Sequence, residues 1–376
     1  MGQKQGNAVI KKIILVLISS LLLYSVGFCD EKVDGENQAV ILMYHHFGVE
    51  KYPTTNIRLQ QFDAHLDYLS KVGYKIWPLT KVAEYIKDRK VFPGRVLAIT
   101  IDDAYLSVYQ EAYPRLRKRG WPFTVFVATD GIDHKYHSYM TWDQMREMQK
   151  HGVTFANHSS SHDYLIRYKP NETTAQWKSR VRHDIEHAQS RLKTELGKAP
   201  MLFAYPFGEY NAALARIVTN MGYVAFGQQS GPAGVQGDIR DLPRFPMSEK
   251  YGEFNQFKQK VASLAFSIND VEPWDPSLLT DHSTANELAP ANPPDMRMTL
   301  GKSDALLDQL TCYVSGQGRV KVKWLNEKER RFSVQAKSPL PGGRSRYNCT
   351  APSTQKGRYY WYSHLWILPV QHAADE

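Results

Sequence analysis

The chain has 376 residues, of which 42% are hydrophobic, and a formal net charge of +9. This length allows one large domain and a smaller one, and the apolar content is ordinary for a globular protein. The basic residues are scattered and no nucleic-acid-binding module accompanies them, so we exclude nucleic acid as the partner. We relate the charge to solubility and to attraction toward an anionic cell envelope.

The N-terminus has the pattern of a secretory signal peptide. Lys11 and Lys12 precede an apolar run at 13–26, and the polar Asp30 follows soon after it. A charged start, a short apolar run and a cleavage region are typical of export signals. We therefore expect residues 1–29 to be a signal peptide and the mature protein to be periplasmic or secreted. The run is short for a membrane span, so an uncleaved signal anchored in the inner membrane is the less favoured alternative.

Between residues 39 and 266, apolar runs alternate with amphipathic stretches that have helical spacing. Several runs are almost continuously apolar, as strands buried on both faces of a sheet are. The predicted strands are 39–43, 96–101, 123–127, 153–156, 201–204 and 224–227. The predicted helices are 61–72, 105–119, 142–150, 177–196 and 211–221, and glycines at 120, 152, 197 and 222 follow four of them. This alternation predicts a parallel α/β sheet or barrel.

The pattern changes after residue 270. Prolines recur through residues 271–296 and leave little periodicity, which predicts a linker. Beyond the linker, alternation with period two at 319–324 and 331–335 and an aromatic run at 359–367 predict strands. We therefore expect an α/β domain at 30–270 and a small β-rich module at 297–376.

The cysteines fit an exported protein. Cys29 falls at the signal boundary, which leaves Cys312 and Cys349 as a pair in the C-terminal region. In an oxidising compartment such a pair is expected to form a disulfide. Two unpaired buried thiols are the alternative.

Two polar motifs stand where apolar strands run into loops. Asp102 and Asp103 end the strand 96–101, and His158 and His162 follow the strand 153–156. Paired carboxylates need a counter-charge when buried, and imidazoles are ligands that zinc prefers. Alone, the acidic pair is often a loop start and the histidine spacing arises by chance. Together, at strand ends of an α/β fold, they predict a metal-dependent catalytic site.

The motifs resemble those of the polysaccharide deacetylases, carbohydrate esterase family 4 with the NodB homology domain. Residues 100–104 (TIDDA) resemble the family's TFDDG motif, and residues 158–162 (HSSSH) resemble its H-S/T-x-x-H motif. Residues 205–208 (YPFG) stand where the family has an RxPYG-like loop. The run ILMYHH at 41–46 resembles the branch that includes the biofilm poly-N-acetylglucosamine deacetylases. The resemblance covers roughly residues 39–266.

This resemblance implies a distorted (β/α) barrel, often with about seven strands, and one divalent metal, commonly zinc. It also implies that Asp102 is the general base and that Asp103, His158 and His162 are the metal ligands. Three protein ligands leave room for water and the substrate oxygen, as a hydrolytic zinc site requires. A backbone N–H near Phe207 would stabilise the tetrahedral oxyanion.

The sequence departs from the family pattern in its third motif. Ala204 replaces the arginine that orients the catalytic aspartate, and Phe207 replaces a tyrosine. We expect Arg244, which follows another transition from an apolar run to a loop, to replace the missing guanidinium. A surface arginine in a turn is the alternative.

The remaining candidates are a general acid and sugar-binding aromatic residues. We find no clear copy of the family's late L-x-H histidine, so His45, at the end of the first strand, is the candidate acid. Trp142 and Tyr205 are candidate stacking surfaces for sugar rings. For each of these three side chains, a structural role in the core is the alternative.

These inferences predict an exported, metal-dependent hydrolase that removes N-acetyl groups from an N-acetylglucosamine-containing polysaccharide and releases acetate. Peptidoglycan, poly-N-acetylglucosamine and chitin-like polymers all fit as substrates, and no protein partner is inferred. A related amidase with a non-sugar substrate and a catalytically silent glycan-binding protein are the alternatives. A silent binder is expected to hold glycan after metal removal and to release no acetate when metal is present.

Overall fold

The computed structural model describes residues 35–272 and 293–368. The predicted signal peptide at 1–29 and most of the predicted linker at 271–296 therefore lie outside the described residues. Among the residues that are described, no helix has the length and apolar character needed to cross a lipid bilayer.

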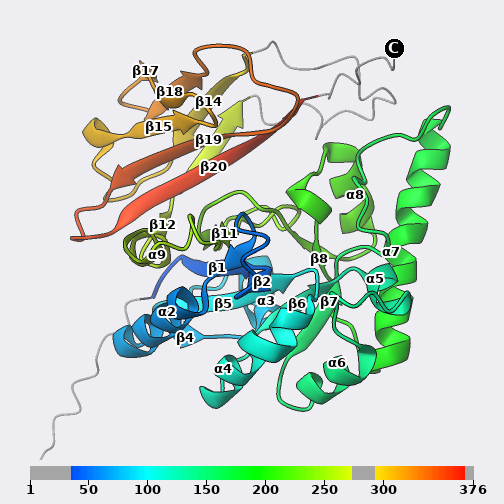
Figure 1. The fold of residues 1–376 in the computed structure, drawn as a ribbon. Coiled ribbons are helices and arrows are strands. Elements are labelled where there is room, and N and C mark those ends of the chain that lie inside the picture. Colours follow the sequence, from blue (N-terminus) through cyan, green and yellow to red (C-terminus); the bar gives the residue numbers. More distant parts are fainter. Residues whose placement is uncertain (1–34, 273–292, 369–376) are drawn as a thin grey trace, which may run out of the picture. The chain divides into compact units, whose positions relative to one another are not determined.

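The predicted strands of the α/β domain form one parallel sheet (Figure 1). Neighbouring strands pair in parallel throughout the series that begins with β1. The series is β1 (Gln38–Tyr44), β5 (Val96–Asp102), β6 (Thr124–Val127), β7 (Thr154–Asn157), β8 (Leu202–Ala204) and β9 (Val224–Phe226). These strands confirm the six strands that were predicted from apolar runs in the sequence.

A short segment joins the two edges of this sheet. Leu242 forms a parallel bridge with Phe226 of β9, and β11 (Phe245–Pro246) pairs in parallel with β1. Two further short strands extend the sheet, namely β4 (Lys75–Ile76) beside β5 and β10 (Ala233–Gly234), antiparallel to β1. The prediction of a distorted (β/α) barrel of about seven strands is therefore confirmed.

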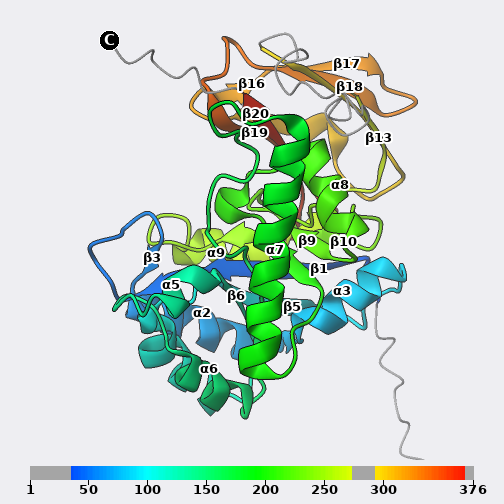
Figure 2. The same cartoon turned by 90° about the vertical axis from the view of Figure 1, so that its right-hand side faces the viewer.

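Helices cover the sheet, and five of the eight described α-helices lie where the amphipathic pattern predicts them. The described helices are α2 (Leu59–Val72), α3 (Leu79–Lys87), α4 (Tyr113–Lys118), α5 (Thr129–Asp133), α6 (Trp142–Gln149), α7 (Thr174–Leu196), α8 (Ala212–Asn220) and α9 (Phe254–Val261). The helix predicted at 105–119 begins later, with a π-helical turn at Val108–Ala112 that leads into α4. Figure 2 shows α7 in front of the sheet, beside α5 and α6.

Successive side chains of β5 point alternately to the outer apolar core and to the inside of the barrel. Leu97, Ile99 and Ile101 pack outward in the apolar cluster that includes α2 residues. Ala98 faces the other way, in the inner cluster with Phe126 of β6. Because side chains alternate along a strand, Asp102 shares the inner face with Ala98. The end of β5 therefore directs a carboxylate into the mouth of the barrel.

The C-terminal residues form two sheets around one apolar core, and all their strand pairs are antiparallel except β12 with β20, which is parallel. One sheet contains β12 (Leu264–Ala265), β15 (Thr311–Val314), β16 (Gly318–Val320), β19 (Gly343–Pro352) and β20 (Tyr359–Leu368). The other contains β13 (Ile268–Glu272), β14 (Asp295–Leu300), β17 (Val322–Asn326) and β18 (Arg331–Gln335). The β-rich module is confirmed, although β12 and β13 begin before its predicted boundary and β13 and β14 enter both ends of the predicted linker.

The predicted disulfide is present in this module. Cys312 on β15 and Cys349 on β19 lie directly opposite each other in the antiparallel pair and are joined by a disulfide bond. The strand predicted at 319–324 is divided between β16 and β17, which belong to different sheets.

Candidate active site

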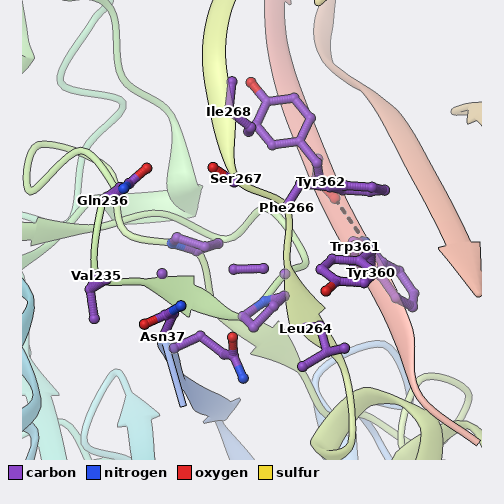
Figure 3. A pocket seen from close by; sticks show the side chains of 18 of the residues that line it. Asn37, Val235, Gln236, Leu264, Phe266, Ser267, Ile268, Tyr360, Trp361 and Tyr362 are labelled. Atoms are coloured by element: carbon purple, nitrogen blue, oxygen red, sulfur yellow. Dashed lines mark hydrogen bonds between the residues drawn. The ribbon is translucent and has the colours of Figure 1, made fainter. Parts of the chain in front are cut away.

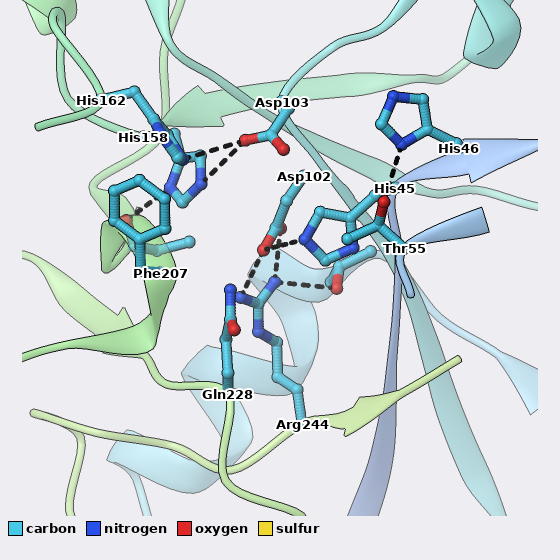
Figure 4. Close-up of polar contacts among 12 residues, drawn as sticks. His45, His46, Thr55, Asp102, Asp103, His158, His162, Phe207, Gln228 and Arg244 are labelled. Atoms are coloured by element: carbon cyan, nitrogen blue, oxygen red, sulfur yellow. Dashed lines mark hydrogen bonds and ion pairs between the residues drawn. The ribbon is translucent and has the colours of Figure 1, made fainter. Parts of the chain in front are cut away.

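Asp102 ends β5 and is completely buried. Arg244, also fully buried, reaches it from the segment that closes the barrel (Figure 4). The guanidinium donates two parallel hydrogen bonds, from Nη1 to Oδ1 at 2.7 Å and from Nη2 to Oδ2 at 2.8 Å. Its Nε donates to the carbonyl of Gly227 at 2.9 Å, and Nη1 also donates to Thr100 Oγ1 at 3.1 Å. The guanidinium is thus held at several points.

This pairing determines the charge of Asp102. Burial raises the pKa of the carboxyl group, but the positive charge and hydrogen bonds of Arg244 outweigh it. The pKa of Asp102 is therefore below its ordinary value, and the group is an ionised carboxylate at neutral pH. It can accept a proton, as a general base must.

The next residue, Asp103, turns toward a pair of histidines. Its backbone has a φ of 75°, and its N–H donates to the carbonyl of Phe126 at 3.0 Å. Its Oδ1 lies 3.3 Å from Nε2 of His158 and 3.1 Å from Nε2 of His162. The ligand atoms of these three side chains all lie within 4.8 Å of one another. Residues from the ends of two strands therefore converge on one point.

The three side chains are suited to hold a divalent metal. His158 Nδ1 is 2.7 Å from the carbonyl of Ala204, which requires the proton on Nδ1 and leaves the lone pair on Nε2. That Nε2 and Asp103 Oδ1 are buried and have no hydrogen-bond partner among the described residues. One carboxylate oxygen and two imidazole nitrogens form a donor set that zinc accepts. The observed atoms therefore fit a metal ion.

Of the two adjacent histidines after β1, one faces the site. His45 Nε2 lies 4.0 Å from Asp102 Oδ2. Burial lowers the pKa of His45, although the carboxylates of Asp103 and Asp102 act in the opposite direction. His46 instead places Nδ1 3.1 Å from Thr55 Oγ1 (Figure 4). His45 is thus the histidine placed to exchange protons beside Asp102.

Phe207 borders the metal-ligand set on the opposite side from His45. It lies in the turn Pro206–Gly208 and has a φ of 57°. Its ring centroid is 4.6 Å from that of His162 and 4.0 Å from that of Tyr164, on which it stacks. The side chain of Phe207 therefore forms an apolar surface beside His162.

Sequence reasoning missed two tyrosines near the metal ligands. Tyr164 is one, and Tyr105 is the other: Tyr105 interacts with Asp103 and stacks on His46 at 3.8 Å. Burial, followed by the charge of Asp103, raises the pKa of Tyr105. Tyr105 lies two residues after Asp103, and Tyr164 lies two residues after His162. This closeness in sequence to the two motifs could have identified both tyrosines.

The two residues predicted to stack on sugar rings, Tyr205 and Trp142, both pack against apolar clusters. Tyr205 is completely buried, and its hydroxyl donates to the carbonyl of Arg240 at 2.8 Å. No face of its ring is left for a sugar, so the prediction for Tyr205 is wrong and the core role applies. Trp142 is half-buried against the outer apolar cluster, with its indole N–H donating to Asp133 at 2.8 Å. Its use in substrate binding stays a prediction.

A cavity of about 810 Å³ lies beside the aromatic strand β20 (Figure 3). Tyr360, Trp361 and Tyr362 line it together with Phe266. None of the metal-ligand residues, nor Asp102, belongs to its lining. Trp361 also packs edge-on against Phe245 at 5.3 Å, so part of the aromatic cluster packs on barrel residues.

Comparisons with known proteins agree with this geometry. Residues 89–226 match the family model described as polysaccharide deacetylase. YxkH of Bacillus subtilis (strain 168) is 28% identical over 183 residues, which are 49% of this chain and 61% of that protein. The poly-beta-1,6-N-acetyl-D-glucosamine N-deacetylase of Escherichia coli (strain K12) is 22% identical over 245 residues, which are 56% of this chain and 36% of that protein. The chain thus spans less than two thirds of each of these relatives.

Solved structures show the same fold. IcaB from Ammonifex degensii aligns with a TM-score of 0.51 and 25% identity, over 58% of this chain and 95% of its own. A de-N-acetylase from Aggregatibacter actinomycetemcomitans aligns with a TM-score of 0.53 and 18% identity, over 59% of this chain and 98% of its own. Residues 89–226 therefore match the polysaccharide deacetylase family, and the solved structures show that the barrel has the fold of known deacetylases.

Proposed function

We propose that this protein hydrolyses the N-acetyl groups of an N-acetylglucosamine-containing polysaccharide and releases acetate, using one divalent metal, zinc. The observation that carries the proposal is the convergence of Asp103, His158 and His162 beside an ionised, fully buried Asp102. The E. coli relative is named as acting on poly-beta-1,6-N-acetyl-D-glucosamine, which supports this class of substrate.

In this proposal Asp102 is the general base and Arg244 is its positioning residue. A bound divalent metal polarises the acetyl carbonyl and makes a water molecule more acidic. Asp102 accepts the proton of the attacking water, because its carboxylate is ionised and lies next to the metal ligand Asp103. Arg244 orients both carboxylate oxygens through its paired hydrogen bonds. It thereby performs the role for which the family uses an arginine at the position of Ala204.

Two further groups complete the reaction. The leaving nitrogen needs a proton, and we assign its delivery to His45, whose Nε2 lies 4.0 Å from Asp102 Oδ2. The backbone N–H of Phe207 is the proposed donor to the oxyanion that forms on the acetyl group, and such donors contribute roughly 10²–10³ in rate. The oxygen of water becomes the second carboxylate oxygen of acetate, the proton taken up by Asp102 passes through His45 to the freed amine, and the remaining water proton dissociates to solvent.

We also propose that the protein works outside the cytoplasm. The disulfide between Cys312 and Cys349 is of a kind that persists in oxidising compartments. This agrees with a signal peptide at residues 1–29. The silent glycan-binding alternative, motivated by the missing arginine at position 204 and the missing late histidine, is less favoured, because all four residues of the candidate metal centre are present and Arg244 pairs with Asp102.

Acetate release from defined glycans tests this function. Zinc-loaded protein is incubated with N-acetylglucosamine oligomers, poly-N-acetylglucosamine and peptidoglycan, beside the variants Asp102→Asn and His158→Ala. His183→Ala, an exposed histidine on α7, is the matched control. We expect release by the parent chain and the control, and loss in both site variants. Zinc-loaded protein that releases acetate from none of the glycans would contradict the proposal.

A further inference from the structure

Strand β19 carries two arginines on one face. Because side chains alternate along a strand, Arg344 and Arg346 point the same way. Their partners across the antiparallel pair with β20 are Ile367 and Leu365. Leu365 and Ile367 pack in the apolar cluster that contains Tyr205, Tyr210 and residues of α8. The arginines therefore project from the face of β19 that packs on the barrel.

Arg344 reaches the edge of the catalytic site. Its Nη1 donates to the carbonyl of Phe207 and to Gln228 Oε1, the latter at 3.1 Å. The ring of Phe207 lies against that of His162, at 4.6 Å between centroids. The C-terminal module thus contacts the turn that borders the metal-ligand set, although this module lies outside the family match at 89–226.

Positive charge exceeds negative charge at this edge. Glu209 lies 3.8 Å from Arg344 and 3.8 Å from Arg167, so one carboxylate serves two guanidinium groups. The guanidinium of Arg346 has no side-chain hydrogen bond or ion pair within the described ranges, and its Nε is buried without a partner. The groups that act on its charge are Arg344, Tyr251 and Tyr210.

This environment is unfavourable for an isolated cation. Burial, and then the charge of Arg344, lowers the pKa of Arg346 to about 10, while Tyr251 and Tyr210 act in the opposite direction. At neutral pH the group is still charged. Arg346 is half-buried, so its charge is partly desolvated and lacks a counter-ion, and an anionic ligand would offset the cost in free energy.

We propose that Arg346, with Arg344 beside it, forms a subsite for a carboxylate on a sugar close to the one being deacetylated. The substrate is then an anionic N-acetylated glycan, so this inference rests on the function proposed above. The planar guanidinium fork of arginine matches a carboxylate through two parallel hydrogen bonds. Arg346 is the principal contact, because Arg344 is already engaged by Phe207, Gln228 and Glu209.

Matched oligomers test the subsite. β-1,4-linked N-acetylglucosamine oligomers, whose C6 hydroxyl groups are free, are compared with the same oligomers in which some C6 hydroxymethyl groups are oxidised to carboxylates. The readout is the ratio of kcat/KM on the carboxylated to that on the neutral oligomer. We expect Arg346→Gln to lower this ratio about tenfold or more, the size of a lost charged hydrogen bond. Arg346→Lys keeps the charge and loses the fork, so an intermediate ratio is expected. The exposed Arg319→Gln is the control and should keep the parental ratio.

Failure of the subsite and failure of the proposed hydrolysis are distinguishable. Binding of both oligomers to Asp102→Asn protein is measured by calorimetry, which needs no turnover. Tighter binding of the carboxylated oligomer that is lost in the Asp102→Asn, Arg346→Gln double variant supports the subsite even if no acetate is released. Equal affinity for both oligomers, or a preference that Arg346→Gln leaves unchanged, overturns it.

Discussion

At the level of single residues, the proposed hydrolysis requires that the buried carboxylate of Asp102 stay ionised. Asp102 is fully buried, yet the hydrogen bonds and charge of Arg244 keep its pKa below the ordinary value. Arg244 comes from a segment 142 residues away in sequence, and that segment also closes the barrel. The same short stretch of chain therefore completes both the sheet and the ion pair between Arg244 and Asp102.

Substitution of Arg244 should lower turnover more than substrate binding. We expect Arg244→Ala to reduce kcat about 10- to 100-fold with a smaller change in KM, the effect seen when groups that orient site ligands are lost. Leaving the charge of Asp102 buried and unpaired should also lower the unfolding free energy by about 3–5 kcal/mol. Arg244→Lys keeps the charge and serves as the folded comparison. Full kcat in both variants would show that Arg244 does not position Asp102.

At the scale of elements, a buried histidine connects α2 to the loop that follows β11. Nε2 of His65 lies 2.7 Å from the carbonyl of Gly252, so Nε2 carries the proton and Nδ1 accepts from the hydroxyl of Tyr44 at 3.1 Å. The ring also stacks on Phe257 of α9 at 3.7 Å. Each contact uses the neutral imidazole.

This contact should make stability depend on pH. Burial lowers the pKa of His65 to about 4, below its ordinary value of 6.5. Between these values the unfolded chain binds more protons, so the unfolding free energy rises with pH and the contribution of His65, about 3 kcal/mol at most, is lost as pH falls. We expect His65→Gln to flatten urea-unfolding free energies measured from pH 6.5 to 4.5. An unchanged slope would contradict this assignment.

The disulfide should stabilise the C-terminal sheets. Cys312 and Cys349 are separated by 37 residues, and a loop of this length corresponds to about 4 kcal/mol in the chain-entropy model. We expect the double variant Cys312→Ala, Cys349→Ala to unfold the module at lower temperature, measured by calorimetry on the full chain. If the melting profile matched that of the oxidised parent, the bond would not constrain the module.

At the scale of the whole molecule, much of the barrel and the metal-ligand set could be predicted from the sequence. The strands are continuous apolar runs, and Asp102, Asp103, His158 and His162 lie in two local motifs, so no distant contact was needed to find them. The helix α3 was missed because it is short and follows Pro78 without a side-chain cap.

Features that depend on distant contacts could not be read in this way. The burial of Tyr205 results from Tyr210 and Arg240, and nothing in its own motif signals it. The approach of Arg344 to Phe207 requires β19 to pack on the barrel, which alternation along the strand cannot predict. The family match covers only residues 89–226, so the role of the C-terminal module had to come from its contacts.

A zinc titration of chelator-treated protein, with bound zinc and acetate release recorded together, separates metal binding from hydrolysis. We expect acetate release from N-acetylglucosamine oligomers to rise with added zinc and to saturate at one zinc ion per chain. Asp102→Asn should bind the same zinc and release no acetate, while His158→Ala should lose tight zinc binding. Full acetate release by metal-free protein would show that hydrolysis needs no metal. Full release by zinc-loaded Asp102→Asn would show that Asp102 is not the general base.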